Sequence, residues 1–220
     1  QTGDRLLCWL RFFIVWEAPV SAVTLHLKQL GNELVQPFDL TVAPGKICCI
    51  SGASGSGKSR LLRAVADLEP HCGQVLLNDL EQQQLPADQW RQRVRLVPAE
   101  SQWWAESVIE HFSTACSREE LEALGLPHGA LDWQVSRLST GERQRLGILR
   151  ALAVPLDVLL LDEPCANLDP DTTRRVETLL LERIRAQGWP ALWVAHDAAQ
   201  IRRVADAHLS IDEGHLVEVK

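Results

Sequence analysis

Apolar and polar positions along this chain follow patterns that predict strands. Residues 23–30 alternate between apolar and polar, as in a strand that buries one face. Residues 34–42 predict a second strand, which ends at the turn Pro44-Gly45. Residues 47–50 are continuously apolar, which is typical of a parallel strand covered on both faces. Further strands are predicted at residues 94–97, 158–161 and 191–195, with two short strands within residues 209–219.

Apolar residues at helical spacing predict helices between these strands. We expect one helix over residues 60–68, where several apolar residues share a face and Pro70 follows. Asp169-Pro170 begins another helix, with proline in its first turn. Helical patterns also cover residues 106–112, 118–124 and 142–153. The sequence therefore predicts an α/β core with a helical subdomain inserted at about residues 100–155.

The composition is that of a soluble globular protein. The chain has 220 residues, of which 46% are apolar and 23% are charged. The net charge of −7 argues against binding through a basic surface, so no nucleic-acid partner is expected. The six cysteines form no CxxC pair and no metal-ligand spacing, which favours a reduced, cytosolic compartment.

The sequence contains no apolar run long enough to cross a bilayer. The best candidate, residues 6–16, is too short and is interrupted by Arg11. No clear small-residue cleavage site follows, so a leader or an edge strand is favoured over a signal peptide. We interpret residues 1–20 as an extension of uncertain role and residues 21–220 as one domain, since no linker or repeat divides them.

A candidate phosphate-binding loop lies between the strand predicted at residues 47–50 and the helix predicted at residues 60–68. Its glycines let the backbone curl and aim N–H groups at a polyphosphate. The helix adds its positive end, Lys58 can reach the β- and γ-phosphates, and the Ser59 hydroxyl can bind Mg²⁺. The strand–loop–helix context disfavours a chance glycine-rich turn. The loop consists of Gly52, Ala53, Ser54, Gly55, Ser56, Gly57, Lys58 and Ser59.

A second stretch of the chain narrows the class of nucleotide-binding protein. It contains, in order, Ser139-Thr140-Gly141-Glu142, an apolar strand that ends in Asp162-Glu163-Pro164, and Asn167-Leu168-Asp169. These segments resemble the signature motif, Walker B motif and D-loop of ATP-binding cassette (ABC) ATPases. The resemblance covers the chain from about Ala22 to its end. It implies a P-loop ATPase core with a mixed sheet, an antiparallel β subdomain and an inserted helical subdomain.

The resemblance also implies roles for acidic residues and a histidine. Asp162 ends an apolar strand and would hold Mg²⁺, while Glu163 matches the residue that polarises the attacking water. Taken alone, two such carboxylates would suit a helix cap equally well. His196 follows the strand predicted at residues 191–195 and matches the switch histidine that senses the γ-phosphate. An isolated histidine at a strand end is more often structural.

A second anion-binding helix N-terminus is predicted at Ser139 and Gly141. In the ABC family, the signature of one subunit closes the phosphate site of another in a head-to-tail dimer. The resemblance therefore implies a second copy of the chain, or a homologous cassette, as a partner. Asp169 matches the D-loop aspartate at the dimer seam. The signature departs from its common form, because Thr140 and Glu142 replace Gly and Gln.

Two further positions depart from the family pattern. Ala99 occupies the place of the Q-loop glutamine, and an alanine side chain cannot bind Mg²⁺ or water. Glu100, one position later, is a candidate substitute because carboxylates bind Mg²⁺ well. The aromatic residue that stacks on adenine is absent, and Leu30 or Gly31 falls near its place.

Trp103 and Trp104 follow the Q-loop position, on the surface that receives a helix of the membrane subunit in ABC transporters. Two interpretations remain open. Exposed aromatic residues often mark interfaces, but these tryptophans would serve equally well as core residues of the helical subdomain.

The resemblance implies an ATPase that binds ATP and Mg²⁺ and powers transport through a separate membrane subunit, at the inner face of the cell membrane. A soluble ABC ATPase that acts on DNA, ribosomes or iron–sulfur machinery is the alternative. The absence of a sustained heptad pattern between loop and signature disfavours the DNA-repair members, and the single cassette disfavours the ribosome-acting members. Glu163 and His196 disfavour a regulator that binds ATP without cleaving it.

Overall fold

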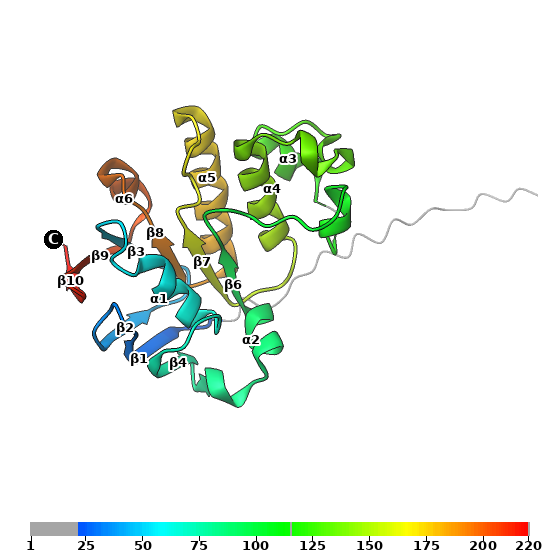
Figure 1. Cartoon of the computed structure of the whole chain (residues 1–220). Helices are drawn as coiled ribbons and strands as arrows, with labels where there is room; N and C mark the ends of the chain where they lie inside the picture. The colour runs from blue at the N-terminus through cyan, green and yellow to red at the C-terminus, as the bar shows by residue number, and fades with distance from the viewer. Residues whose placement is uncertain (1–21, 115, 220) are drawn as a thin grey trace, which may run out of the picture.

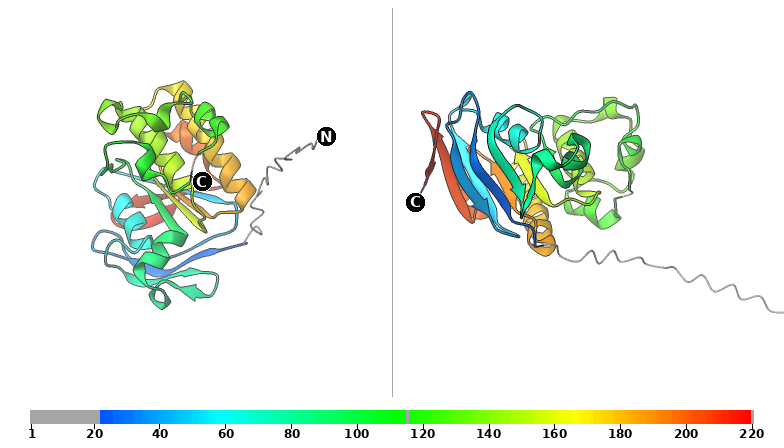
Figure 2. Two further views of the ribbon diagram at one scale, coloured as in Figure 1. Left: turned by 90° about the vertical axis from the view of Figure 1, so that its right-hand side faces the viewer. Right: turned by 90° about the horizontal axis from the view of Figure 1, so that it is seen from below.

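The computed structural model describes residues 22–114 and 116–219, which form two sheets with helices between and beside them (Figure 1). The two sheets enclose α1 (Lys58–Val65), and further helices cover the other face of the larger sheet (Figure 2). The chain is thus an α/β protein with one antiparallel and one mixed sheet, which confirms the fold class that the sequence predicts.

The smaller sheet is antiparallel, with the strand order β2–β1–β4–β5. In β1, Leu25 and Leu27 are buried while His26 is half-buried and Lys28 is exposed, as the alternating pattern predicts. The buried leucines face α1 and the larger sheet. The strands are β1 (Leu25–Gly31), β2 (Phe38–Val42), β4 (Cys72–Leu77) and β5 (Leu80–Glu81).

The larger sheet has the order β10–β9–β3–β8–β7–β6 and is parallel except for the edge strand β10. In β3, Ile47 and Cys49 face one core, while Cys48 and Ile50 face the other. Burial raises the pKa of both cysteine thiols to about 12, so they act as small apolar residues. The strands are β3 (Ile47–Gly52), β6 (Val94–Val97), β7 (Val158–Asp162), β8 (Ala191–Val194), β9 (Ala207–Asp212) and β10 (His215–Glu218).

Two apolar cores fix the helices. Between the sheets, Leu61, Leu62 and Val65 of α1 are buried among strand residues, which holds the start of α1 at the carboxyl end of β3. On the other face of the larger sheet, a second core joins the strands to helices that are far apart in the sequence. These helices are α4 (Thr140–Leu152), α5 (Pro170–Gln187) and α6 (Ala198–Val204).

The segment between β6 and β7 is mostly helical and irregular. It contains α3 (Arg118–Ala123), α4, and short 3₁₀ turns at Ile109–His111, Ala130–Asp132 and Val135–Arg137. Its helices lie at one end of the molecule, beside α5 (Figure 1). We retain the helical subdomain at about residues 100–155 as a proposal.

Two of the sequence-based boundaries are wrong. The helix expected at residues 106–112 is only a 3₁₀ turn, because the N–H of Val108 bonds to the carbonyl of Trp133 and thereby ties the chain to another segment. The strand expected at residues 34–42 begins at Phe38. The side chain of Asn32 accepts hydrogen bonds from the N–H groups of Leu34 and Val35, which turns the chain before the strand starts.

Several elements are absent from the sequence prediction. The β4 strand begins with polar residues and Gly73, and α2 (Ala87–Arg93) and α6 are short. In α2, the one buried residue is Trp90, whose indole N–H donates to the carbonyl of Val65 in α1. A single buried anchor gives no helical period to detect, so α2 is set by this contact rather than by a local pattern.

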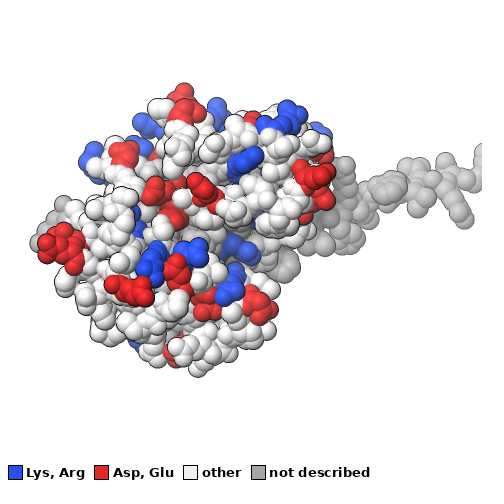
Figure 3. Space-filling model, in the orientation of Figure 1, with Lys and Arg blue, Asp and Glu red and all other residues white. Residues whose placement is uncertain are grey.

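Among the described residues, no helix is long and apolar enough to span a membrane. The apolar run at residues 6–16 and the extension at residues 1–20 lie outside the described residues. On the face shown in Figure 3, basic and acidic side chains are interspersed, with no large area of one sign.

Candidate functional site

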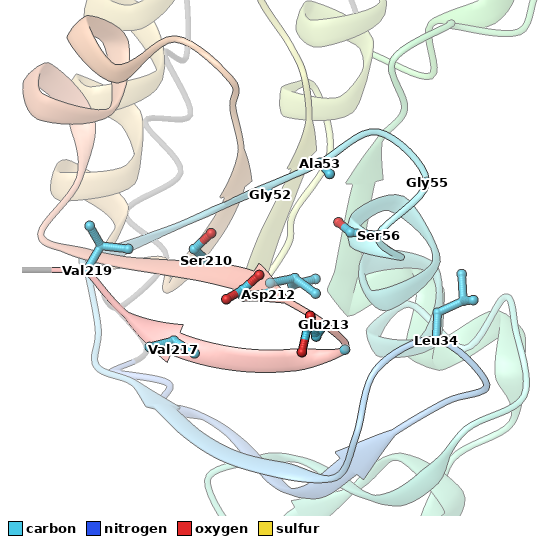
Figure 4. A pocket seen from close by; sticks show the side chains of 12 residues that line it. Leu34, Gly52, Ala53, Gly55, Ser56, Ser210, Asp212, Glu213, Val217 and Val219 are labelled. Carbon is cyan, nitrogen blue, oxygen red and sulfur yellow. The ribbon is translucent and has the colours of Figure 1, made fainter.

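The loop of residues 52–59 joins the carboxyl end of β3 to the start of α1 (Figure 4). Gly52 has a φ of 141° and Gly57 a φ of 102°, a region of backbone conformation that favours glycine. A Cβ atom on Gly52 would lie 2.8 Å from the carbonyl oxygen of Ile211 in β9. A Cβ atom on Gly57 would lie 3.0 Å from the Cβ of Leu34. Only glycine therefore suits these two positions of the curled loop.

Lys58 lies inside the curl of this loop and is 5% exposed. Its Nζ donates hydrogen bonds to the carbonyl oxygens of Gly52, at 2.9 Å, and Ala53, at 2.8 Å. Burial lowers the pKa of Lys58, and the nearby carboxyl groups of Glu163 and Asp162 oppose that change. The ammonium group is thus partly desolvated and, among the residues that the structure describes, hydrogen-bonded only to carbonyl oxygens. This arrangement favours its interaction with a polyanion.

Ser59 and Asp162 come together from α1 and β7. The Ser59 hydroxyl donates to Oδ1 of Asp162 over 2.9 Å, and Asp162 is buried. Burial raises the pKa of Asp162, while the hydrogen bond from Ser59 opposes the rise. A hydroxyl oxygen and one carboxylate in contact suit Mg²⁺, which takes few protein ligands and completes its octahedron with phosphate and water oxygens.

Glu163 and His196 meet at the carboxyl ends of β7 and β8, which are adjacent parallel strands. Oε1 of Glu163 lies 2.7 Å from Nε2 of His196. The backbone of Glu163 has a φ of 48°, and its N–H donates to the carbonyl of Val194. A glutamate in this left-handed conformation is uncommon, and such strain is concentrated at functional sites. The arrangement holds a carboxylate in a fixed position, half-exposed to water.

Ser139 and Gly141 lie at the beginning of α4, away from the loop of residues 52–59. Ser139 is the N-cap of α4, and its hydroxyl accepts a hydrogen bond from the N–H of Glu142. In return, the Glu142 carboxylate accepts hydrogen bonds from the N–H and the hydroxyl of Ser139, at 2.8 and 2.7 Å. Within residues 22–114 and 116–219, no hydrogen bond joins Ser139 or Gly141 to the loop. One copy of the chain therefore keeps these two candidate anion sites apart.

Asp169 begins α5 and acts as its N-cap. Its Oδ1 accepts hydrogen bonds from the N–H groups of Asp171 and Thr172. Hydrogen bonding by the side chain of Thr172, together with these N–H groups, lowers the pKa of Asp169. The preceding residue, Leu168, packs on the signature, because a Cβ atom on Gly141 would lie 3.2 Å from its Cδ2. The D-loop and signature segments therefore contact each other within a single copy.

Ala99 and Glu100 are both exposed and follow Pro98, which comes directly after β6. Neither forms a side-chain hydrogen bond or ion pair with another described residue. The next residue, Ser101, is held against α4, since a Cβ atom on Gly147 would lie 2.0 Å from its Oγ. The structure therefore does not place Glu100 at the candidate metal site.

Trp103 and Trp104 have different environments: Trp103 fits the core interpretation, while the interface interpretation of Trp104 stays a prediction. Trp103 packs against the core beside α4, whereas Trp104 is 73% exposed. The guanidinium of Arg150 lies 4.6 Å from the Trp103 ring and 5.1 Å from the Trp104 ring. The exposed aromatic ring is therefore fixed in place by a cation on α4.

Two features of the site were missed in the sequence analysis. One is the contact by which Glu142 caps α4; the spacing Ser-x-x-Glu was the available signal, since it is the capping-box pattern. The other is a cavity beside the loop, lined by Leu34 and by residues of β9 and β10. The residues that line this cavity lie far apart in the sequence, so no local pattern predicts that they contact the same cavity.

Comparisons with known proteins identify relatives of this chain. A family model described as "ABC transporter" matches residues 35–166. The chain is 36% identical to an aliphatic sulfonates import ATP-binding protein of Cupriavidus pinatubonensis, over 91% of this chain and 72% of that protein. It is 33% identical to a methionine import ATP-binding protein of Xanthomonas oryzae, over 86% of this chain and 62% of that protein. It therefore spans about three fifths of the length of the latter.

Two further matches concern a shorter relative and a solved structure. The chain is 35% identical to a lipoprotein-releasing system ATP-binding protein of Caulobacter vibrioides, over 83% of this chain and 88% of that protein. The structure of a bacterial Atm1-family ABC exporter with ATP bound superposes with a TM-score of 0.77 at 23% identity, covering 90% of this chain and 39% of that chain. At this identity, the superposition supports the fold alone. The family match and the three relatives show that this chain belongs to the ABC transporter family, as one of its ATP-binding and ATP-hydrolysing subunits.

Proposed function

We propose that this chain binds MgATP at the loop of residues 52–59 and that Glu163 promotes hydrolysis of the γ-phosphate. One observation carries the proposal: three neighbouring strands end at the same edge of the larger sheet. There the loop follows β3, the Asp162-Glu163 pair lies at the end of β7, and His196 comes after β8. A phosphate cradle beside a fixed carboxylate pair is what hydrolysis of a polyphosphate requires.

The loop and Lys58 would bind the phosphates. In the described structure, Lys58 donates to two neutral carbonyl oxygens of its own loop. When ATP enters, we expect Nζ to exchange these oxygens for those of the β- and γ-phosphates. Hydrogen bonds between charged groups are stronger than those to neutral carbonyls, so the exchange favours binding. The first N–H groups of α1 would add their partial positive charge.

Ser59 and Asp162 would hold Mg²⁺, with the remaining ligands supplied by phosphate oxygens and water. When bound there, the ion would neutralise negative charge on the phosphates. Among the described residues, no group of three or more histidine, cysteine, aspartate or glutamate side chains forms an alternative metal site.

In the proposed reaction, a water oxygen attacks the γ-phosphorus and Glu163 accepts the proton of that water. The bond from the γ-phosphorus to the bridging oxygen breaks, and the products are ADP and inorganic phosphate. His196 acts as a positioning residue through its 2.7 Å hydrogen bond to Glu163. At the end of β8, it also lies at the edge of the sheet where the γ-phosphate would be.

A second copy of the chain, or a homologous cassette, would complete the site in a head-to-tail dimer. Ser139 and Gly141 lie apart from their own loop, so we propose that they contact the γ-phosphate held by the partner. Asp169, at the start of α5, would lie at the seam. Without nucleotide we expect monomers or weak dimers, because only ATP bridges the two surfaces.

We also propose that a membrane-spanning subunit on another chain couples hydrolysis to transport, with this chain on the inner face of the cell membrane. Two of the relatives are named as import proteins and one as part of a lipoprotein-releasing system, which supports a transport role. The exposed Trp104, supported by Arg150, is a suitable contact for such a partner.

The experiment that tests the catalytic assignment is Glu163→Gln. The variant keeps the size of the side chain but removes the base, so phosphate release should fall by roughly two to three orders of magnitude while ATP still binds. Light scattering after size exclusion with ATP should then show a dimer. The matched control is Glu182→Gln on α5. Unchanged phosphate release in Glu163→Gln would remove Glu163 from the proposed mechanism.

A further inference from the structure

We propose that Glu177 of α5 is a positioning residue for ATP hydrolysis, which acts through His196. It does so by hydrogen bonds to Gln200 and Arg203 of α6, the helix that begins just after His196. The inference rests on the proposed function, since it takes His196 to hold Glu163 beside the attacking water.

Glu177 is a buried carboxylate that the proposed reaction does not use. Among the described residues, Asp162 and Glu177 are the two buried carboxylates, at 7% and 4% exposure. Asp162 belongs to the candidate metal site, whereas Glu177 lies on α5. Glu177 accepts hydrogen bonds from Nε2 of Gln200, at 3.1 Å, and from Nε and Nη2 of Arg203, at 2.8 and 2.7 Å. This network of three side chains joins α5 to α6.

Stability alone does not explain the network. Moving both charges out of water costs free energy, and apolar residues of similar size often replace such pairs without loss of stability. The two helices already share an apolar core, through Val176 and Leu180 of α5 and Ile201 and Val204 of α6. Apolar contacts are not directional, whereas hydrogen bonds restrict both distance and angle. The network therefore adds a defined position of α6 relative to α5.

The position of α6 determines that of His196. Asp197, the next residue, is the N-cap of α6, and its Oδ2 accepts a hydrogen bond from the N–H of Gln200 over 3.2 Å. Gln200 thus contacts Asp197 through its backbone and Glu177 through its side chain. The His196 side chain is exposed, and its one hydrogen bond to the described residues is to Glu163. Its place is therefore set by the backbone between β8 and α6 rather than by packing.

Gln200 also contacts the segment that follows Glu163. Burial raises the pKa of the Cys165 thiol to about 12, and hydrogen bonding by the Gln200 side chain opposes that rise. Cys165 lies in a tight turn after Glu163, because the N–H of Ala166 donates to the carbonyl of Glu163 over 3.0 Å. The network therefore touches both of the segments whose side chains meet in the contact between Glu163 and His196.

The test measures phosphate release and the ATP dissociation constant of Glu177→Gln, which keeps the size of the side chain but weakens its bonds to Arg203. We expect kcat to fall roughly fivefold, as is typical for coupled neighbours, while ATP affinity is unchanged because the phosphate loop is untouched. His196→Ala should itself lower kcat. Adding Glu177→Gln to His196→Ala should cause no further loss, since the network then has no histidine to position.

A second variant separates positioning from stability. Glu177→Met/Gln200→Met/Arg203→Met replaces the whole network by apolar side chains that form helices well, and leaves neither charge without its partner. Thermal unfolding should occur near the temperature of the wild type, while kcat falls at least as far as in Glu177→Gln. A stable triple variant with full hydrolysis would show that the network serves only the fold, and would overturn the inference.

The matched control is Glu120→Gln, since Glu120 forms an ion pair with Arg183 of α5 but joins that helix to α3. It should leave kcat unchanged. Full hydrolysis in Glu177→Gln, an equal loss with and without His196, or a matching loss of ATP affinity would overturn the inference. If Glu163→Gln abolishes hydrolysis while Glu177→Gln has no effect, the inference alone fails. If Glu163→Gln hydrolyses ATP normally, the proposed function fails and the inference fails with it.

Discussion

Two helices of this protein begin at segments that the sequence assigns to phosphate binding, yet their first turns differ. The N-cap of α1 is Gly57, which has no side chain and so makes no side-chain capping hydrogen bond. The N-cap of α4 is Ser139, which forms a reciprocal cap with Glu142. The start of α1 is thus open to an external anion, whereas the start of α4 already holds a carboxylate of its own.

The difference suggests an order of events. Hydrogen bonds from Ser139 lower the pKa of Glu142 below its ordinary value of 4.5, so this carboxylate is ionised at neutral pH. A phosphate that approaches Ser139 therefore meets a negative charge, while at α1 it meets Lys58. We expect α1 to bind the phosphates first, and α4 of a second copy to join only after they are fixed in place.

The largest expected effect on ATP binding comes from Lys58→Ala, which removes the cation from the open helix. We expect ATP affinity to fall about tenfold to a hundredfold, since a hydrogen bond between charged groups contributes roughly 1.5–3 kcal/mol. Calorimetric titration of the monomer measures this loss. Ser139→Ala is the matched change at the capped helix and should leave the monomer's affinity unchanged. Equal losses in the two variants would contradict the comparison.

A smaller effect is expected when the charge at the capped helix is removed. Glu142→Gln, made together with Glu163→Gln to prevent turnover, keeps an amide oxygen for the cap but removes the negative charge. The ATP concentration needed to form the dimer should fall several-fold, because the phosphate no longer meets a carboxylate.

Light scattering after size exclusion across an ATP series measures that change. The control is Glu120→Gln, since Glu120 forms the same reciprocal cap with Ser117 at the start of α3. It alters the net charge equally without touching the signature. If both variants shift dimer formation alike, the effect comes from net charge and not from the signature helix.

The cap of α4 should also affect stability in a pH-dependent way. The pKa of Glu142 is lowered in the folded state, so its ionised form adds stability above its ordinary pKa of 4.5. This contribution is lost as the pH falls through the lowered pKa. It should amount to a few tenths of a kcal/mol, since the group is only half-buried.

Thermal unfolding of the wild type and Glu142→Gln between pH 7 and pH 3 tests the sign. The wild type should unfold at a slightly higher temperature at pH 7, and the difference should shrink as the solution becomes acidic. Glu106→Gln, at an exposed glutamate, is the control. A difference that is constant across this range would mean that the charge of Glu142 does not stabilise the helix.

The sequence predicts the phosphate-binding loop and the strand ends of the candidate site well. The β3–loop–α1 unit is contiguous, and its glycines, its lysine and the apolar period of its helix all lie within about twenty residues, so local patterns are enough to find it. The meeting of Asp162 with Ser59, and of Glu163 with His196, follows from the rule that parallel strands end at one edge of a sheet. The geometry agrees with these expectations, while the catalytic roles remain proposals.

Other features depend on contacts between distant segments. The α2 helix is fixed by one hydrogen bond from Trp90 to α1, and residues 106–112 are drawn out of a helix by their bond to Trp133. Whether Trp103 or Trp104 is buried depends on how the chain lies on α4, which the spacing of two adjacent tryptophans does not reveal. Tertiary contacts override local preference at these places.

The smallest effect is expected at Glu100, which belongs to neither α1 nor α4. The family pattern has glutamine where this chain has Ala99, and the exposed carboxylate of Glu100 has no hydrogen bond or ion pair among the described residues to restrain it. Ser59 and Asp162 already supply two oxygen ligands, so basal hydrolysis should persist without Glu100. If Glu100 nevertheless approaches the metal when ATP is bound, Glu100→Ala should raise the Mg²⁺ concentration for half-maximal hydrolysis about twofold. Glu106→Ala, also exposed and close in sequence, is the control. An unchanged Mg²⁺ requirement would show that Glu100 does not bind the metal and that water takes the place of the missing glutamine. The physical reason would be that adjacent side chains of an extended segment point in opposite directions. Glu100 would then face away from the site that Ala99 approaches.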